Sequence, residues 1–294
     1  MLQVKRVKSA NLIIMKKLLL ILLCLPLLTL AQKTYVPDDN FEQVLINFGY
    51  DNVLDDSVIT ANIDTVTSID LLVASDLTGI EDFIALTNLF CQGNQGNQLT
   101  TLNVSQNTAL TSLYIAGHQL ISLDLSNNTA LTQLQCSNNQ LTTLDVSNNT
   151  ALTFLICGFN QLTSLDVSAN TNLVTLLCSS NTLTSLDLRN GNNINFSNTN
   201  GIPWAFCVAD SPNLTCINVD DDAWSSVNWT VANGNIDPQH YFSTNCSATA
   251  IEEHTTNKEL LKVTDLLGRE TKQTNHPLFY IFDDGTVEKR IVIE

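Results

Sequence analysis

Basic residues are scarce in this sequence, and their scarcity limits the partners that the chain can have. The 294 residues include 13 lysines and arginines against 29 aspartates and glutamates, which gives a formal net charge of −16. Between Thr34 and Asn257, Arg189 is the only basic residue among 22 acidic ones. Nucleic-acid binding depends on neutralising phosphates with lysine and arginine. We therefore expect no nucleic acid as partner, and the negative field favours cationic partners or divalent ions.

The sequence also lacks the short motifs of common enzymes and metal sites. It contains no H-E-x-x-H, G-x-S-x-G, C-x-x-C or phosphate-binding glycine-rich loop. The four histidines, His118, His240, His254 and His276, are scattered and belong to no recognisable catalytic motif. We predict a protein that is not an enzyme and has no catalytic residues, metal or cofactor. A secreted hydrolase is an alternative, because catalytic partners can converge from distant parts of a sequence.

Long hydrophobic runs are absent after residue 31, so no integral membrane segment is expected in the mature chain. Within the first 31 residues, Met15-Lys16-Lys17 precedes the apolar run LLLILLCLPLLTLA, which ends at Ala31. A basic start, an apolar centre and a small final residue are typical of a secretory signal peptide. We assign residues 1–31 to it and interpret 1–14 as the product of a start codon chosen too far upstream. The protein is predicted to be secreted, extracellular or attached to the outer cell surface.

What the sequence does contain is a repeat. Cys136, Cys157 and Cys178 follow one another at intervals of 21 residues, in segments that read L-x-x-L-x-C-x-x-N-x-L. The same frame covers residues 110–120, with Ile115 in place of the cysteine, and residues 86–99, with three extra residues before Leu99. This is the leucine-rich-repeat pattern, and its fixed period indicates a stacked solenoid. We predict a repeat solenoid with short parallel strands in each coil over residues 66–200.

Each repeat consists of two similar halves, so two parallel sheets are expected around a narrow core. One asparagine per half falls at a turn, where its side chain can bond backbone groups that would otherwise lack partners. We interpret both asparagine columns as structural; they are Asn94, Asn139, Asn160 and Asn181, with His118 once, and Asn107, Asn128, Asn149 and Asn170. The repeat cysteines are predicted to be buried and inert, because a linear row of thiols does not make a tetrahedral zinc site.

The open hydrophobic ends of a solenoid require caps. Residues 32–65 are predicted to form an N-terminal helical cap, with a helix that Asp39 or Asn40 caps at its N-terminus. Its apolar face would consist of Phe41, Val44, Leu45 and Phe48.

Residues 201–250 are predicted to cap the other end, and they hold all three tryptophans together with Cys207, Cys216 and Cys246. An oxidising compartment permits a disulfide there. We favour the pair Cys216–Cys246. Pairings of Cys207 with either of the other two stay open, because connectivity cannot be deduced from sequence.

The composition changes after a linker at residues 251–257, since six basic residues fall within the tail 258–294. The tail is expected to form short strands joined by turns at Gly268 and Asp284-Gly285. It resembles the C-terminal sorting domain of type IX secretion cargo from Gram-negative bacteria, on the segments Lys262-Val263, Leu267-Gly268-Arg269, Tyr280-Ile281 and Lys289-Arg290-Ile291-Val292-Ile293. The whole chain is similar to secreted leucine-rich-repeat proteins with such a tail. This resemblance implies the type IX export machinery as a partner; an ordinary β-rich capping hairpin is the alternative.

The outward face of the first strand in each repeat is the candidate ligand-binding surface. Its residues between the inward leucine and the cysteine column are Phe90, Tyr114, Gln135, Ile156 and Leu177, and Phe154 lies beside them. Exposed apolar strips of this kind commonly mark binding sites, unless a flanking loop covers them. The predicted function is non-catalytic recognition of a protein or glycan, as in adhesion. A structural surface or matrix component that self-associates through the same strip is the alternative.

A column of carboxylates lies in the second strands of the repeats, each directly before an inward aliphatic residue. Its members are Asp124, Asp145, Asp166 and Asp187. We interpret the column as a solvated row, and bridging by calcium is the alternative.

Overall fold

A computed structural model describes residues 31–72, 74–93, 96–196, 205–246, 260–264, 277–282 and 287–291. The chain divides into two compact units, Met1–Cys246 and Ser247–Glu294. Within the described ranges, no helix has the length and apolarity needed to cross a membrane. The expected signal peptide falls outside the described residues, apart from Ala31.

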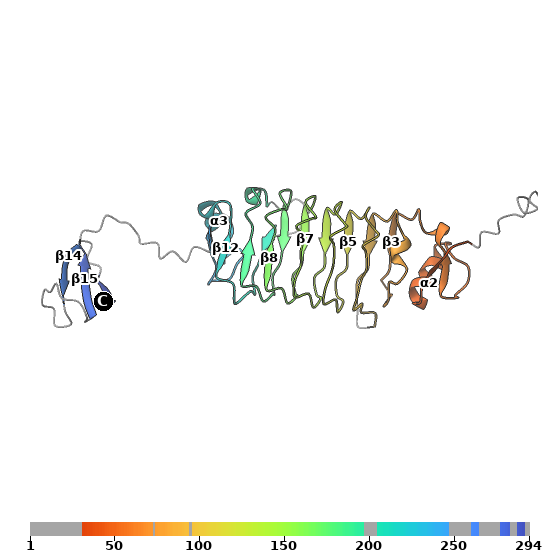
Figure 1. The fold of residues 1–294 in the computed structure, drawn as a ribbon, viewed down its shortest axis with the longest axis horizontal. Coiled ribbons are helices and arrows are strands. Elements are labelled where there is room, and N and C mark those ends of the chain that lie inside the picture. Colours follow the sequence, from red (N-terminus) through yellow and green to blue (C-terminus); the bar gives the residue numbers. More distant parts are fainter. Residues whose placement is uncertain are drawn as a thin grey trace, which may run out of the picture. The chain divides into compact units, whose positions relative to one another are not determined.

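The first unit is built around a parallel sheet of seven strands, one from each successive coil (Figure 1). The first-half strands of the repeats pair in strict register, as Leu113 does with Leu134 and Leu134 with Leu155. This confirms the predicted leucine-rich-repeat solenoid. In chain order the strands are β3 (Ser68–Asp70), β4 (Asn88–Phe90), β5 (Ser112–Tyr114), β6 (Gln133–Gln135), β7 (Phe154–Ile156), β9 (Thr175–Leu177) and β11 (Phe206–Cys207).

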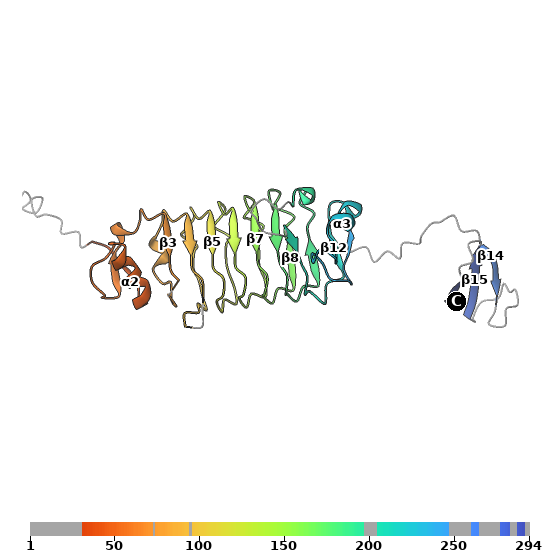
Figure 2. The ribbon, with the colours of Figure 1, turned by 180° about the vertical axis from the view of Figure 1, so that it is seen from behind.

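A second parallel sheet covers only the C-terminal coils, which differs from the expected strand in every half-repeat. It contains β8 (Ser164–Asp166), β10 (Ser185–Asp187), β12 (Cys216–Asn218) and β13 (Tyr241–Ser243), and β8 and β12 are labelled in the view from behind (Figure 2). In the earlier coils the second halves are still joined, for example by Gln140 N donating to Leu120 O at 2.9 Å. A strand needs a ladder of such bonds, so these segments stack without forming one.

Alternation along the first strands places leucines and cysteines in the core. Cys136, Cys157 and Cys178 are fully buried, as expected, and belong to one core cluster with the repeat leucines. Burial raises the pKa of the Cys136 thiol to about 12 and that of Cys157 well above its ordinary value. Because the thiolate is the reactive form, these cysteines are held protonated and unreactive.

The N-terminal cap combines the antiparallel pair β1 (Lys33–Tyr35) and β2 (Ser57–Ile59) with helix α2 (Asp39–Asn47). The helix cap is Asp38, not Asp39 or Asn40, because the Asp38 carboxylate accepts the amide of Phe41 at 2.8 Å. The other Asp38 oxygen accepts the amide of Ser75 at 2.9 Å and so ties the helix to the first coils. Phe41 and Leu45 are buried as expected, whereas Phe48 lies past the helix end and is exposed.

Short 3-10 turns lie near the N-terminal end at η1 (Thr60–Asn62) and η2 (Ile80–Asp82), and another lies near the C-terminal coils at η3 (Asn193–Asn195). Next to η2, the ring of Phe83 stacks on Phe41 of α2, with centroids 5.9 Å apart. This contact packs the helix onto the open end of the core.

An aromatic cluster and a disulfide close the C-terminal end of the first unit. Trp229 follows helix α3 (Asp222–Asn228) and is buried, with its ring centroid 4.3 Å from that of Phe206 and 5.7 Å from that of Phe242. Cys216 and Cys246 form a disulfide, and Cys207 is a free cysteine. Trp204, one of the three tryptophans of the expected cap, lies outside the described residues.

The second unit contains an antiparallel sheet of three strands. These are β14 (Leu260–Thr264), β15 (Pro277–Phe282) and β16 (Val287–Ile291), with β15 in the middle. The expected turns at Gly268 and Asp284-Gly285 lie outside the described residues.

Candidate functional site

The candidate site is a row of side chains on the outer face of the seven-stranded sheet. Each residue of the row pairs with the next through the strand register, because its neighbours occupy the same position one coil earlier and one coil later. All five are half-buried. We call this row the strip, and it consists of Phe90, Tyr114, Gln135, Ile156 and Leu177.

The two aromatic residues of the strip support one another. The ring centroids of Phe90 and Tyr114 are 5.4 Å apart, and the Tyr114 hydroxyl donates to Gln133 Oε1 at 3.3 Å. Both rings are therefore held in place before any partner arrives, which lowers the entropy that binding would cost. Next to Phe90 in the register lies Asp70, which is exposed and gives this end of the strip a negative flank.

Phe154 does not lie on the accessible surface, although we expected it beside the strip. Only 7% of this residue is exposed. It lies in register between Gln133 and Thr175, and Thr175 is buried too. Neighbouring strands are about 4.8 Å apart, so adjacent side chains on this face cover one another. The accessible apolar surface is thus one residue wide.

The first asparagine column links successive coils through side-chain hydrogen bonds to the backbone. The Asn160 carboxamide donates to Cys136 O and Cys157 O, both at 3.0 Å, and its oxygen accepts Leu141 N at 3.0 Å. Asn139 and Asn181 repeat this pattern one coil earlier and later.

Two positions near the start of this column depart from the repeat. His118 substitutes for asparagine, with its Nδ1 accepting Leu99 N at 3.2 Å, and burial lowers its pKa. Asn94 lies outside the described residues, whereas the buried Asn97 stands two residues before Leu99, as the column asparagines do before their leucines. Asn97 donates to Leu72 O. The three-residue insertion therefore shifts the column position from Asn94 to Asn97.

The second asparagine column donates in the same way, but its side-chain oxygens accept no hydrogen bond from the described residues. Asn149 donates to Leu125 O at 3.1 Å and to Asn128 O at 2.8 Å. Its Oδ1 is buried and has no hydrogen-bond donor among the described residues, and the same holds for Asn107, Asn128 and Asn170. Fewer backbone groups depend on each member of this column than on each member of the first.

The aspartate column forms local turns. One carboxylate oxygen of each member accepts the amide two residues later, as Asp145 does from Ser147 at 2.9 Å and Asp166 from Ser168 at 2.8 Å. Hydrogen bonds from the Ser147 side chain and amide hold the pKa of Asp145 below its ordinary value. Asp145 and Asp166 line one cavity of about 250 Å³ with hydroxyl groups around them. These contacts fit the interpretation of a solvated row, which stays a prediction.

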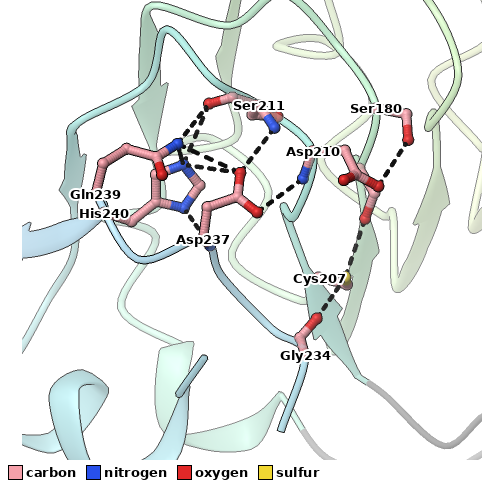
Figure 3. Close-up of polar contacts among 9 residues, drawn as sticks. Ser180, Cys207, Asp210, Ser211, Gly234, Asp237, Gln239 and His240 are labelled. Atoms are coloured by element: carbon pink, nitrogen blue, oxygen red, sulfur yellow. Dashed lines mark hydrogen bonds and ion pairs between the residues drawn. The ribbon is translucent and has the colours of Figure 1, made fainter. Parts of the chain in front are cut away.

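A polar cluster at the C-terminal end brings together residues that the sequence did not connect (Figure 3). The Asp237 carboxylate accepts the amides of Asp210 and Ser211, both at 3.0 Å, shortly after β11, the last strand of the seven-stranded sheet. Although burial opposes it, these hydrogen bonds lower the pKa of Asp237. His240 Nδ1 accepts the amide of Asp237 at 3.1 Å, and its Nε2 lies 3.3 Å from Ser211 O.

Serine, histidine and aspartate are the residue types of a hydrolytic triad, but this cluster has a different geometry. Ser211 is fully buried and its hydroxyl has no hydrogen-bond partner among the described residues. A triad nucleophile needs a hydrogen bond to its base. We interpret the cluster as a structural cap of the backbone.

Three carboxylates at the N-terminal cap come nearest to a metal site in the described part of the chain. The ligand atoms of Glu42, Asp51 and Asp55 lie within 4.8 Å of one another. The buried Glu42 accepts three amides of residues 55–57, and Asp55 pairs with Lys33 at 3.1 Å. One buried oxygen of Asp51 has no described donor. The hydrogen bonds of Glu42 and Asp55 indicate that these carboxylates hold the backbone of residues 55–57 in place.

Comparisons with known proteins found similar solved structures. No protein-family model matches the chain, and no curated protein matches it. The functional domain of InlJ from Listeria monocytogenes, described as including a cysteine ladder, is 35% identical, with 64% of this chain and 38% of that chain covered and a TM-score of 0.48. Internalin C2 from the same organism is 18% identical, with 72% and 97% covered and a TM-score of 0.41. Internalin InlF is 18% identical, with 63% and 56% covered and a TM-score of 0.39. With TM-scores below 0.5, none of these indicates what this chain does.

Proposed function

We propose that this chain is a non-catalytic, exported binding protein that recognises a protein partner through the strip. The observation that carries the proposal is the strip itself, five uncharged, half-buried side chains that neighbour one another across five strands. Protein interfaces have cores poor in charge and rich in aromatic residues, with polar rims. Phe90 and Tyr114 are the expected anchors, because their rings are already ordered by mutual contact.

A protein fits the strip better than a glycan does. Three of its five residues, Phe90, Ile156 and Leu177, offer no hydrogen-bonding side chain, whereas sugar recognition needs several placed polar groups. Gln135 in the middle supplies one amide that can set the register of a partner. Around the strip the first unit is acidic, so a partner with a basic rim is favoured.

Export is the second part of the proposal. The predicted signal peptide at residues 1–31 and the tail at 258–294 support delivery to the cell exterior, where the chain would be secreted or attached to the outer cell surface. The three antiparallel strands of the second unit are compatible with a sorting domain and equally with a capping hairpin. The choice of a sorting domain rests on the sequence resemblance.

Tyr114→Ala and Ile156→Ala are each expected to weaken partner binding by about 10- to 100-fold, since they remove contact area at the centre of the interface. A photo-crosslinking residue at position 135 would capture the partner from surface extracts, and titration calorimetry with the purified partner would measure the dissociation constants. Ile121→Ala is the matched control, because Ile121 is an exposed aliphatic residue outside the strip.

Equal affinity of Tyr114→Ala, Ile156→Ala and the parent chain would contradict the proposal. Loss of capture after glycosidase treatment of the extract would favour a glycan instead. Concentration-dependent assembly of the chain alone, abolished by the same substitutions, would favour a structural component.

Removal of residues 258–294 tests the export proposal. We expect the shortened chain to stay in the periplasm of a type IX secreting bacterium, because the sorting signal is gone, while the first unit keeps its melting temperature. Fractionation with immunodetection measures the location. Normal appearance outside the cell would show that the tail is a capping hairpin.

A further inference from the structure

A column of turn residues with left-handed backbone follows the strands of the seven-stranded sheet. Backbone hydrogen bonds join them coil to coil: Phe159 N donates to Ser179 O, and Ser180 N donates to Ala209 O, both at 2.9 Å. Each of these acceptors directly precedes the next member of the column. The five members, with φ between 55° and 80°, are Gly117, Asn138, Phe159, Ser180 and Asp210.

Phe159 is the exception in this column. Its φ of 55° lies in a region that glycine, asparagine and aspartate tolerate and that is unfavourable for bulky side chains. Burial does not compensate for the strain, because 60% of the residue is exposed. The turn needs a residue with left-handed backbone but does not need a phenylalanine, and strain of this kind often marks functional sites. The combination of strain and exposure calls for a role that lies outside the packing of the solenoid.

The neighbours of Phe159 supply the other half of a site. Ser180 follows it in the column, and Asp210 follows Ser180, with the Ser180 hydroxyl donating to Asp210 Oδ2 at 3.4 Å (Figure 3). At a coil spacing of about 4.8 Å, Phe159 and Asp210 stand about 10 Å apart along the column, with only a small side chain between them. A planar cation can stack one face on an aromatic ring while the N–H groups at its edge donate to a carboxylate.

The charge around this position also favours a cation. Asp210 is exposed, and no described basic side chain pairs with it. The two basic residues described in the first unit are already engaged, Lys33 with Asp55 and Arg189 with Asp187. Asp237 lies next to Asp210 and adds a second negative charge.

We propose that Phe159, Ser180 and Asp210 form a socket for the guanidinium group of an arginine on a partner protein. The Phe159 ring supplies the surface on which the guanidinium stacks, and the Asp210 carboxylate accepts its hydrogen bonds. Ser180 lies between these two residues, and its small side chain leaves room for the guanidinium. Arginine fits better than lysine, because its planar head both stacks and forms directed hydrogen bonds. The socket shares no residue with the strip, so this proposal does not depend on partner binding by the strip.

NMR titration of the full chain with N-acetyl-argininamide tests the socket. We expect saturable shifts of the Phe159, Ser180 and Asp210 amide signals, weaker shifts with N-acetyl-lysinamide, and none with the neutral N-acetyl-glutaminamide. Phe159→Asn and Asp210→Asn should each raise the dissociation constant at least tenfold, whereas the exposed control Ile121→Asn should not change it. Phe159→Asn should also keep or raise the melting temperature, because Asn138 holds the same turn one coil earlier.

Three outcomes would overturn the socket. One is argininamide shifts that are spread over the acidic surface or are equally large with glutaminamide. Another is an unchanged dissociation constant in Phe159→Asn. The third is a clearly lower melting temperature of Phe159→Asn, which would make Phe159 a structural residue.

Discussion

Asn160→Ala is expected to lower the free energy of unfolding by about 2–4 kcal/mol. The substitution leaves the buried amide of Leu141 without an acceptor and removes one hydrogen bond each to Cys136 O and Cys157 O. Both carbonyls keep a second partner, since Asn139 donates to Cys136 O and Asn181 to Cys157 O. The orphaned amide is therefore the largest part of the cost.

Urea denaturation followed by circular dichroism measures this loss. Asn149→Ala is the matched control, because Asn149 loses two donated hydrogen bonds and leaves no amide unpaired. We expect it to cost about half as much as Asn160→Ala. Equal denaturation midpoints for Asn160→Ala and the parent chain would contradict the structural role of this column.

Trp229→Ala is expected to cost about 3–5 kcal/mol, as large aromatic truncations in cores do. Its ring contacts those of Phe206 and Phe242, and these join the last strands of the two sheets. In a solenoid each coil contacts only its neighbours, so the damage should stay local. The C-terminal coils would open while the central coils remain folded.

Hydrogen exchange resolved by peptide measures this locality. Amides of β12 and β13 should exchange much faster in Trp229→Ala, and those of β5 and β6 should keep their protection. Trp224→Ala provides the comparison, because Trp224 is only partly buried and its ring packs in a T-shaped contact with that of Trp229. Uniform loss of protection along the first unit would mean that the coils unfold as one body.

The sequence predicted the solenoid because its signal is repeated many times. The 21-residue interval of Cys136, Cys157 and Cys178 determines coil length and register at once, and the leucine spacing predicts which face is buried. Both features depend on short-range alternation, which sequence reveals directly.

The sequence did not predict which residues of the outer face are accessible. Phe154 and Ile156 both face outward from β7, yet only Ile156 stays half-exposed. That difference depends on side chains of neighbouring coils, which lie 21 or more residues away. The backbone angle at Phe159 and the capping of Asp210 by Asp237 depend in the same way on the stacked coils.

The insertion before Leu99 shows a different limit. The repeat frame places Asn94 in the first asparagine column, whereas Asn97 is the buried residue that stands two before the leucine. Counting three residues forward from Cys91 gives Asn94, which is the wrong residue because of the insertion. Counting two residues back from Leu99 gives Asn97, which is the right one. The distance to the following leucine was the more reliable signal.

The most direct test of the account is a distance series along the outer row of the seven-stranded sheet. Native Cys207 occupies that row in register with Leu177 and is half-buried, so it can carry one spin label. A second label is placed at position 70, 90 or 114 through Asp70→Cys, Phe90→Cys or Tyr114→Cys. Double electron–electron resonance measures the distance between the two spin labels in each variant. Stacked coils predict about 29, 24 and 19 Å, one strand spacing of about 4.8 Å less at each step. Separations that do not fall by equal steps would mean that the coils are not stacked in register.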